Sequence, residues 1–222
     1  MADHIEDALI REVNEELREE QMMKLWKRYG GYAIGVAVLV VAIVAGYQGW
    51  KQYTTNTRLE EGERFYAASQ LAGMDNADAA LSAFQSLAAD ASTGYGILSS
   101  FQAAALMADA GNMSGATALY TQIAQENAAD TAVSGLASVM GAALEINAGG
   151  YDRAALEQRL QAISGDDQPY RYSARELLGL IALDAGDVAS ARTQFDQLST
   201  DAAAPQSMAQ RARDIVQSLG SN

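Results

Sequence analysis

The chain has 222 residues and a formal net charge of −13, and from Leu59 onward it carries 20 Asp and Glu against 8 Arg and no Lys. Such an acidic surface repels phosphate backbones, which argues against nucleic acid as a partner. The chain has no Cys, and its one His is His4. These counts exclude a disulfide framework and a cysteine nucleophile, and they exclude histidine-based catalytic or zinc sites in the large C-terminal part. We expect no metal and no cofactor.

Residues 1–28 form the first expected part, an acidic amphipathic segment. Ile5, Leu9, Val13 and Leu17 recur every four residues among acidic side chains, which predicts a short helix. An acidic helix is not drawn to an anionic membrane surface by charge alone. The segment therefore either docks on a protein or is a solvated tail.

Residues 29–50 are predicted to form a transmembrane helix. The stretch from Tyr29 to Trp50 has 22 residues and no ionisable side chain except Tyr, and as a helix it would span about 33 Å, enough for a hydrocarbon core. Lys24, Lys27 and Arg28 precede it, and an excess of basic residues marks the cytoplasmic side. We therefore expect a cytoplasmic N-terminus and an exported C-terminal part.

Two other interpretations of this stretch were weighed. A signal peptide has an apolar region of about 7–15 residues close to the start of the chain, whereas this run is longer and begins at residue 29. The second alternative is a buried core helix. Charge-free windows of this length are rare in soluble domains, so an uncleaved membrane anchor is favoured.

Small residues fall on one side of this predicted helix, at Gly31, Gly35, Ala42, Ala45 and Gly49. Association of helices in lipid depends on close backbone approach, which small residues permit. We expect this face to pack against another membrane helix, either a partner subunit or a second copy. The alternative is that Gly and Ala are simply common in membrane helices.

Residues 51–58 are expected to be a juxtamembrane linker, and residues 59–222 a repeat domain. Gly73, Gly111, Gly149 and Gly186 stand 38, 38 and 37 residues apart, each after an Ala-rich apolar stretch. Glycine just past a helix is a common C-terminal stop. Two helices per unit of this length predict an all-α fold, an α-solenoid of tetratricopeptide-like helix pairs. The alternative is an irregular helical bundle with chance spacing.

Other residues recur at matching offsets from these glycines. The last unit has Leu178, Gly179, Ala191, Phe195 and Leu198 at tetratricopeptide positions. The second unit has Ala103, Ala104, Ala116, Tyr120 and Ile123. The third has Ala142, Tyr151 and Ala154, with Gln158 in place of the aromatic residue, and the first has Ala80, Phe84 and Leu87 displaced by about two residues. Residues 207–219 predict a C-terminal capping helix with apolar residues at Met208, Ile215, Val216 and Leu219.

The anchor and its flanks resemble a known family. The run Glu19-Glu20-Gln21, then Leu25-Trp26-Lys27, Gly30 and Gly49-Trp50 is similar to the tetratricopeptide-like single-pass inner-membrane family of proteobacteria. That family includes the ancillary subunit of the SecYEG translocon. The resemblance implies a bacterial inner-membrane location, with a cytoplasmic N-terminus and a periplasmic repeat domain that contacts the translocon and periplasmic chaperones. The acidic extension before Glu19 is a departure from the family.

Three classes of function were compared. The first is a membrane-tethered protein-binding module, because solenoids present extended concave surfaces. The candidate concave partner-binding positions are Leu98, Phe101, Leu136, Val139, Ile146, Leu180 and Leu183. The alternative is that these residues pack against neighbouring helices. The second class, an enzyme using Asp166 and Asp167, is disfavoured because that pair lies in a predicted loop. The third is a scaffold subunit of another envelope assembly, in cell-wall or outer-membrane biogenesis.

Overall fold

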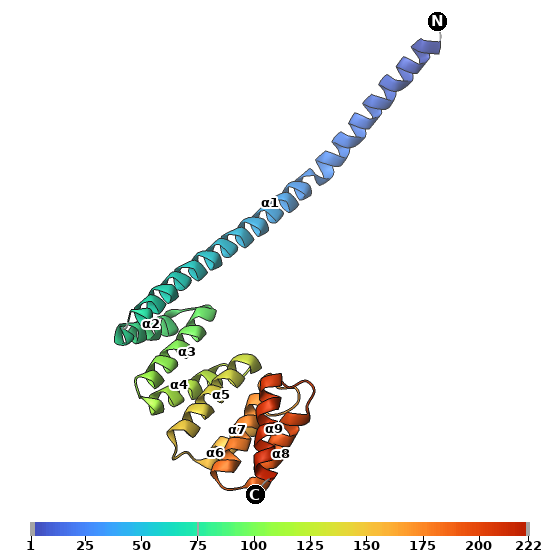
Figure 1. Cartoon of the computed structure of the whole chain (residues 1–222). Coiled ribbons are helices and arrows are strands. Elements are labelled where there is room, and N and C mark those ends of the chain that lie inside the picture. The colour runs from blue at the N-terminus through green and yellow to red at the C-terminus, as the bar shows by residue number, and fades with distance from the viewer. Residues whose placement is uncertain (1–2, 75, 221–222) are drawn as a thin grey trace. The chain divides into compact units, whose positions relative to one another are not determined.

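The computed structural model describes residues 3–74 and 76–220, with side chains for 22–32, 34–74 and 76–220. All regular elements in these ranges are α-helices (Figure 1). In chain order they are α1 (Asp3–Gly73), α2 (Ala77–Asp90), α3 (Gly94–Asp109), α4 (Met113–Glu126), α5 (Thr131–Ala148), α6 (Arg153–Ala162), α7 (Arg171–Asp184), α8 (Val188–Thr200) and α9 (Gln206–Gly220). The predicted all-α fold class is confirmed.

The chain divides into two compact units after Thr57. The part of α1 before this point makes up the described residues of the first unit. Its N-terminal segment is helical from Asp3, as part of the continuous helix α1 rather than as the separate short helix that the four-residue spacing predicted. The side chains of that amphipathic pattern lie outside the described part of the structure.

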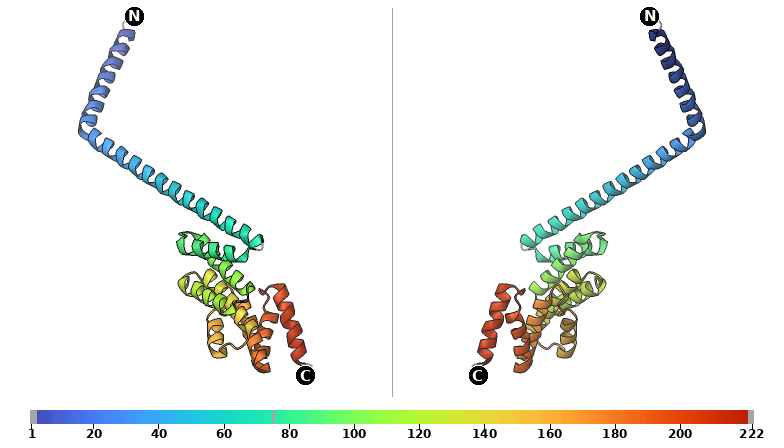
Figure 2. Two further views of the ribbon diagram at one scale, coloured as in Figure 1. Left: turned by 90° about the vertical axis from the view of Figure 1, so that its left-hand side faces the viewer. Right: turned by 90° about the vertical axis from the view of Figure 1, so that its right-hand side faces the viewer.

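The second unit consists of helix pairs stacked in chain order (Figure 2). The C-terminal part of α1 pairs with α2, followed by the pairs α3 with α4, α5 with α6 and α7 with α8. The second helices of three pairs each bury one aromatic side chain, at Phe84, Tyr120 and Phe195. A repeated core position of this kind is what a solenoid of similar units requires, since each unit buries its apolar face against its neighbours.

Gly179 shows why this packing needs a small residue on the first helix of the last pair. A Cβ atom at this position would lie 2.7 Å from two ring carbons of Phe195. The absent side chain lets the aromatic ring of α8 lie directly against the backbone of α7. The predicted Leu-Gly and aromatic positions of the last unit are therefore brought together.

Glycines end α3 and α7 as the sequence predicts. Gly111 and Gly186 have φ values of 82° and 73°, a left-handed conformation that only glycine adopts without strain. The amide after each glycine closes the turn, since Asn112 N donates to Met107 O and Asp187 N to Ala182 O, both at 2.8 Å. The side chains of these two residues then cap the next helix.

The first unit of the repeat departs from the expected frame. Gly73 is the last residue of α1 and does not take the left-handed conformation. The comparable turn bond comes two residues later, where Asn76 N donates to Leu71 O at 3.2 Å. This shift of two residues explains the displaced core positions, which are all buried: Ala80, Phe84 and Leu87.

The predicted frame of the third unit is wrong by two residues. Ala154 and Gln158, expected at the helix crossing, are exposed, while Leu156 and Leu160 are fully buried. The turn contains two consecutive left-handed glycines, at positions 149 and 150. Because of this longer turn, α6 begins only at Arg153. The helix therefore places leucines at the core positions where Ala154 and Gln158 were expected.

The C-terminal cap is confirmed. Helix α9 buries Ala209 and Ala212 against the last pair, together with Phe195 and Leu198 of α8. The four apolar residues predicted for its inner face all pack against this cluster: Met208, Ile215, Val216 and Leu219. A terminal helix of this kind covers the last apolar face of a repeat stack.

Candidate protein-interaction surfaces

Helix α1 contains a candidate membrane span. The stretch Ile34–Gly73 holds an 18-residue window of mean hydropathy 1.6, none of it buried. Every residue from 34 to 50 is exposed. A charge-free helical surface without protein contacts is suited to lipid. Among the described residues, this is the one helix long and apolar enough to cross a membrane.

The small residues of this span lie on an open helix surface. Gly31, Gly35, Ala42, Ala45 and Gly49 are all exposed, and a Cβ atom at any of the three glycines would meet no atom within 4 Å. Gly30 differs, because the Trp26 indole lies over it and a Cβ there would be 3.2 Å from Cε2 of that ring. The face predicted for helix packing is therefore free of contacts from its own chain in the described residues.

The seven candidate concave residues fall into two groups. Leu98 on α3 and Leu180 on α7 expose 51% and 37% of their surface, so they are available to a partner. Phe101, Ile146 and Leu183 are partly buried and pack against core clusters. The Phe101 ring lies 5.9 Å from that of Tyr120, measured between centroids.

The remaining two candidates, Leu136 and Val139 on α5, are half-buried. The sequence left both interpretations open because the first helices of the pairs are apolar nearly all round. In the structure, Leu98 and Leu180 are the candidates with the most accessible apolar surface.

Hollows recur where a second helix of one pair meets the next pair. One of about 210 Å³ lies between α2, α3 and α4, and one of about 360 Å³ lies between α4, α5 and α6. Ser100 and Ser138 line these two hollows at equivalent repeat positions, and each hydroxyl donates to the carbonyl four residues earlier in its own helix. The larger hollow is lined mainly by Ala, Ser and Gly, and it is wide enough to receive a side chain of a bound polypeptide.

A buried carboxylate organises the start of α3, and sequence reasoning missed it. Glu61 is 5% exposed and accepts hydrogen bonds from the amide of Ser92 at 2.8 Å, from the Ser92 hydroxyl at 3.2 Å and from the Thr93 hydroxyl. Burial alone would raise the pKa of Glu61, but these hydrogen bonds outweigh it and hold the pKa below its usual value. Glu61 lies in a run of polar residues, so nothing in its local sequence indicates that it is buried. The residues that donate to it lie 31 and 32 positions later in the chain.

The acidic pair considered for catalysis lies in the loop between α6 and α7. The Asp166 side chain is 92% exposed and forms an ion pair with Arg175 at 2.6 Å. Arg175 also donates to Ser164 O at 3.1 Å, so it holds the loop in place. The ion pair therefore stabilises the loop, and the exposed Asp166 is not in the buried environment typical of a catalytic acid or base. No group of three or more His, Cys, Asp or Glu suited to a metal ion occurs among the described residues.

Comparison with known families gives one match that spans most of the chain. The sequence profile of a family described as a tetratricopeptide repeat-like domain matches residues 23–218. The searches of curated proteins and of solved structures gave no significant match. The matched region includes both the candidate membrane span and the helix pairs.

Proposed function

We propose that this chain, which belongs to the tetratricopeptide repeat-like domain family, is a membrane-anchored protein–protein interaction module. The fold is typical of non-catalytic interaction scaffolds. The observation that carries the proposal lies in α1. This helix includes an exposed, charge-free stretch long enough to cross a membrane, and its residues from Arg58 onward belong to the repeat domain.

At a finer level, we propose an ancillary translocon subunit that links a SecYEG-type secretion channel to periplasmic chaperones. The support is the resemblance of the anchor and its flanks to the family that includes such a subunit. The proposed location is the bacterial inner membrane, with residues 1–28 cytoplasmic, 29–50 in the membrane and 59–222 periplasmic. The basic residues that precede the span support this orientation: Lys24, Lys27 and Arg28.

The proposed topology is tested with reporters fused after Asn222. Alkaline phosphatase matures outside the cytoplasm, so a phosphatase fusion should be active and a cytoplasmic reporter at the same position inactive. The reverse pattern would contradict the orientation.

The repeat domain would recognise apolar segments of its partners. Leu98 and Leu180 present exposed apolar surface on the first helices of two different pairs. Apolar side chains displayed on different repeats of one stack suit an unfolded segment or an amphipathic partner helix. We further propose that the small-residue face around Gly35 and Ala42 packs against another membrane helix.

Affinity capture of the full-length chain from native nanodiscs, followed by mass spectrometry, tests the partner assignment. Recovery of channel subunits and periplasmic chaperones is the expected result. Replacing Leu98 and Leu180 by Glu should abolish that recovery without unfolding the domain, since both side chains are exposed. Ala118→Glu, at an exposed position on α4, is the matched control and should retain partner recovery.

Two outcomes would contradict this assignment. Recovery of cell-wall or outer-membrane machinery in place of the channel would favour a scaffold subunit of that assembly. Unchanged recovery with the Leu98→Glu and Leu180→Glu variant would show that this face is not the binding surface.

A further inference from the structure

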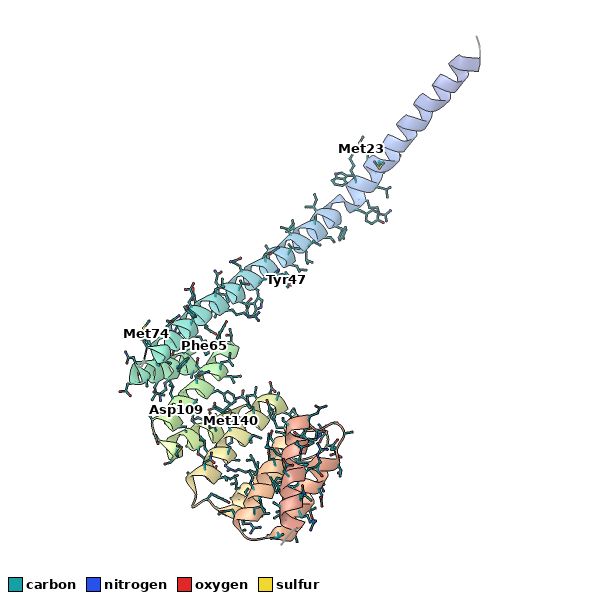
Figure 3. All side chains as sticks on the ribbon, in the orientation of Figure 1. Met23, Tyr47, Phe65, Met74, Asp109 and Met140 are labelled. Atoms are coloured by element: carbon teal, nitrogen blue, oxygen red, sulfur yellow. The ribbon has the colours of Figure 1, made fainter. Side chains whose placement is uncertain are left out.

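The hollow between α2, α3 and α4 is the more polar of the two hollows between helix pairs. It encloses about 210 Å³ beside the N-terminal half of α3, the helix that ends at Asp109 (Figure 3). The C-terminal ends of α2 and α4 both lie at its wall, and such ends carry partial negative charge. None of its lining residues is basic, and the polar ones are Ser92, Thr93, Ser100, Glu126 and Asn127.

The last turn of α2 brings an unpaired carbonyl group to this hollow. In a continuing helix the amide of Ser92 would donate to the carbonyl of Ala88, four residues earlier. It donates instead to the buried carboxylate of Glu61 at 2.8 Å. The carbonyl oxygens of Ala88 and Ala91 lie 3.6 and 3.4 Å from the point where a Cβ atom on Gly96 would stand. Both acceptors therefore lie beside Gly96, which itself lines the hollow.

The last helix pair has an arginine at the position that Ser100 takes in α3. The turns after α3 and α7 are closed by the same kind of bond, in which an amide donates to the carbonyl of Met107 or of Ala182. Seven residues before these two carbonyls stand Ser100 and Arg175. The short side chain of α3 and the long basic one of α7 thus occupy equivalent places in the repeat.

Arg175 shows how a guanidinium fits at this place. Its side chain is only 14% exposed. It donates to Ser164 O at 3.1 Å and to the Asp166 carboxylate at 2.6 Å. Ser164 directly follows the C-cap of α6, as Ser92 directly follows the C-cap of α2. In the last pair, the chain therefore covers the C-terminal end of the preceding helix with its own cation.

The hollow between α2, α3 and α4 has no such cation available from its surroundings. In the other hollow, Arg159 belongs to the lining and pairs with Glu145 at 2.5 Å. Between Leu59 and Asp152, however, the sequence has 11 Asp and Glu and a single basic residue, Arg64. Arg64 pairs with Asp90 at 3.2 Å. A cation for the more polar hollow therefore has to come from another molecule.

We propose that the hollow between α2, α3 and α4 receives an arginine side chain of a protein partner. This inference rests on the proposed function as an interaction module and gives it a second contact site. The guanidinium donates to the carbonyls of Ala88 and Ala91 and pairs with Glu126, which forms no ion pair within the described residues. A planar group with five donors suits such a mixed set of carbonyl and carboxylate acceptors. The acidic surroundings attract a basic segment.

A tethered cation tests the hollow without any partner protein. The chain has no Cys, so Ser100→Cys carries a single thiol. The full-length variant in nanodiscs is equilibrated with equal amounts of cystamine and bis(2-hydroxyethyl) disulfide. The resulting mixed disulfides end in an ammonium or a neutral hydroxyl group, placed as many bonds from the backbone as the terminal nitrogens of arginine. Intact-mass spectrometry measures the ratio of the two adducts.

The matched control is Ser138→Cys, at the equivalent position of the hollow that Arg159 already lines. The ratio of ammonium to hydroxyl adduct should be about fivefold higher at position 100 than at position 138. Adding Glu126→Gln to the Ser100→Cys chain should lower this ratio. Equal ratios at the two positions, or an unchanged ratio with Glu126→Gln, would overturn the proposal.

An arginine peptide tests the partner's side chain itself. A benzophenone-labelled peptide with one arginine should cross-link to the full-length chain at the turn after α2. The same peptide with citrulline, which is uncharged and similar in shape, should label it about fivefold less. Ser100→Arg fills the hollow as Arg175 does in α7 and should abolish the cross-link, with an unchanged circular dichroism spectrum. Glu126→Gln, at an exposed position, should lower the labelling without affecting the fold.

Equal labelling by the two peptides, or full labelling of the Ser100→Arg or Glu126→Gln chain, would contradict the proposal. These measurements are separate from the partner capture that tests the proposed function. Unchanged partner recovery with the Leu98→Glu and Leu180→Glu variant would count against the surface proposed there and would leave the adduct ratio unaffected, because neither residue lines the hollow.

Discussion

Replacement of Phe195 by Ala measures how far the repeat domain depends on its aromatic core position. Phe195 is fully buried on α8, against Gly179 of the preceding helix and the capping residues of α9. Removal of a buried Phe side chain costs about 3–5 kcal/mol when the surroundings cannot collapse. The helices on both sides of this site prevent it from collapsing around the cavity, so we expect a loss of stability in the upper half of that range.

Gly179→Ala tests the same contact from the other side. The new methyl group would lie 2.7 Å from the Phe195 ring, and overpacking of this kind costs about 1–3 kcal/mol. The better helix propensity of Ala returns up to about 1 kcal/mol. A net loss of about 0–3 kcal/mol should follow. The double variant Gly179→Ala with Phe195→Leu should lose less stability than the sum of the losses in the two single variants, because the smaller side chain makes room for the methyl group.

The assay is chemical unfolding of the full-length chain followed by far-UV circular dichroism, with the free energy of unfolding compared between variants. Gly94→Ala is the control, because nothing lies within 4 Å of a Cβ atom at that position, and it should change stability little. A loss below about 1 kcal/mol for Phe195→Ala would refute the packing described for the last unit. Additive losses in the double variant would show that the methyl group and the ring do not meet.

Two further predictions concern the first and third units. Glu61→Gln should destabilise the domain by about 1–3 kcal/mol at neutral pH, because it removes charge-assisted hydrogen bonds to Ser92 and Thr93. Since the pKa of Glu61 is lowered from 4.5 in the folded chain, its stabilisation is present above about pH 4.5 and is lost as the pH falls through the lower folded value. The variant should therefore lose less stability than the wild type on acidification, and equal losses would contradict the role. Leu156→Ala should lower the free energy of unfolding by about 2–5 kcal/mol, whereas Gln158→Ala should leave it nearly unchanged. The reverse order in an unfolding experiment would support the repeat frame predicted from the sequence.

Local signals in the sequence were enough to determine the class of fold and the ends of α3 and α7. The long charge-free stretch predicts a helix whatever surrounds it, because its length and composition are properties of one segment. The left-handed turns at Gly111 and Gly186 were equally predictable, since only glycine adopts that conformation without strain. The frame of the last pair and the inner face of α9 followed from these ends, because helical periodicity then assigns the buried positions.

Tertiary structure decided what depends on partners distant in the chain. The third unit shifted by two residues because the extra left-handed residue at Gly150 lengthened its turn, and the spacing of the glycines alone gives no sign of this. Glu61 is buried because Ser92 and Thr93, some thirty residues later, donate hydrogen bonds to it. Leu98 is exposed while Phe101, one helical turn away, packs on Tyr120. The periodicity of a helix tells which residues share a face, but only the contacts between helices decide which face is covered.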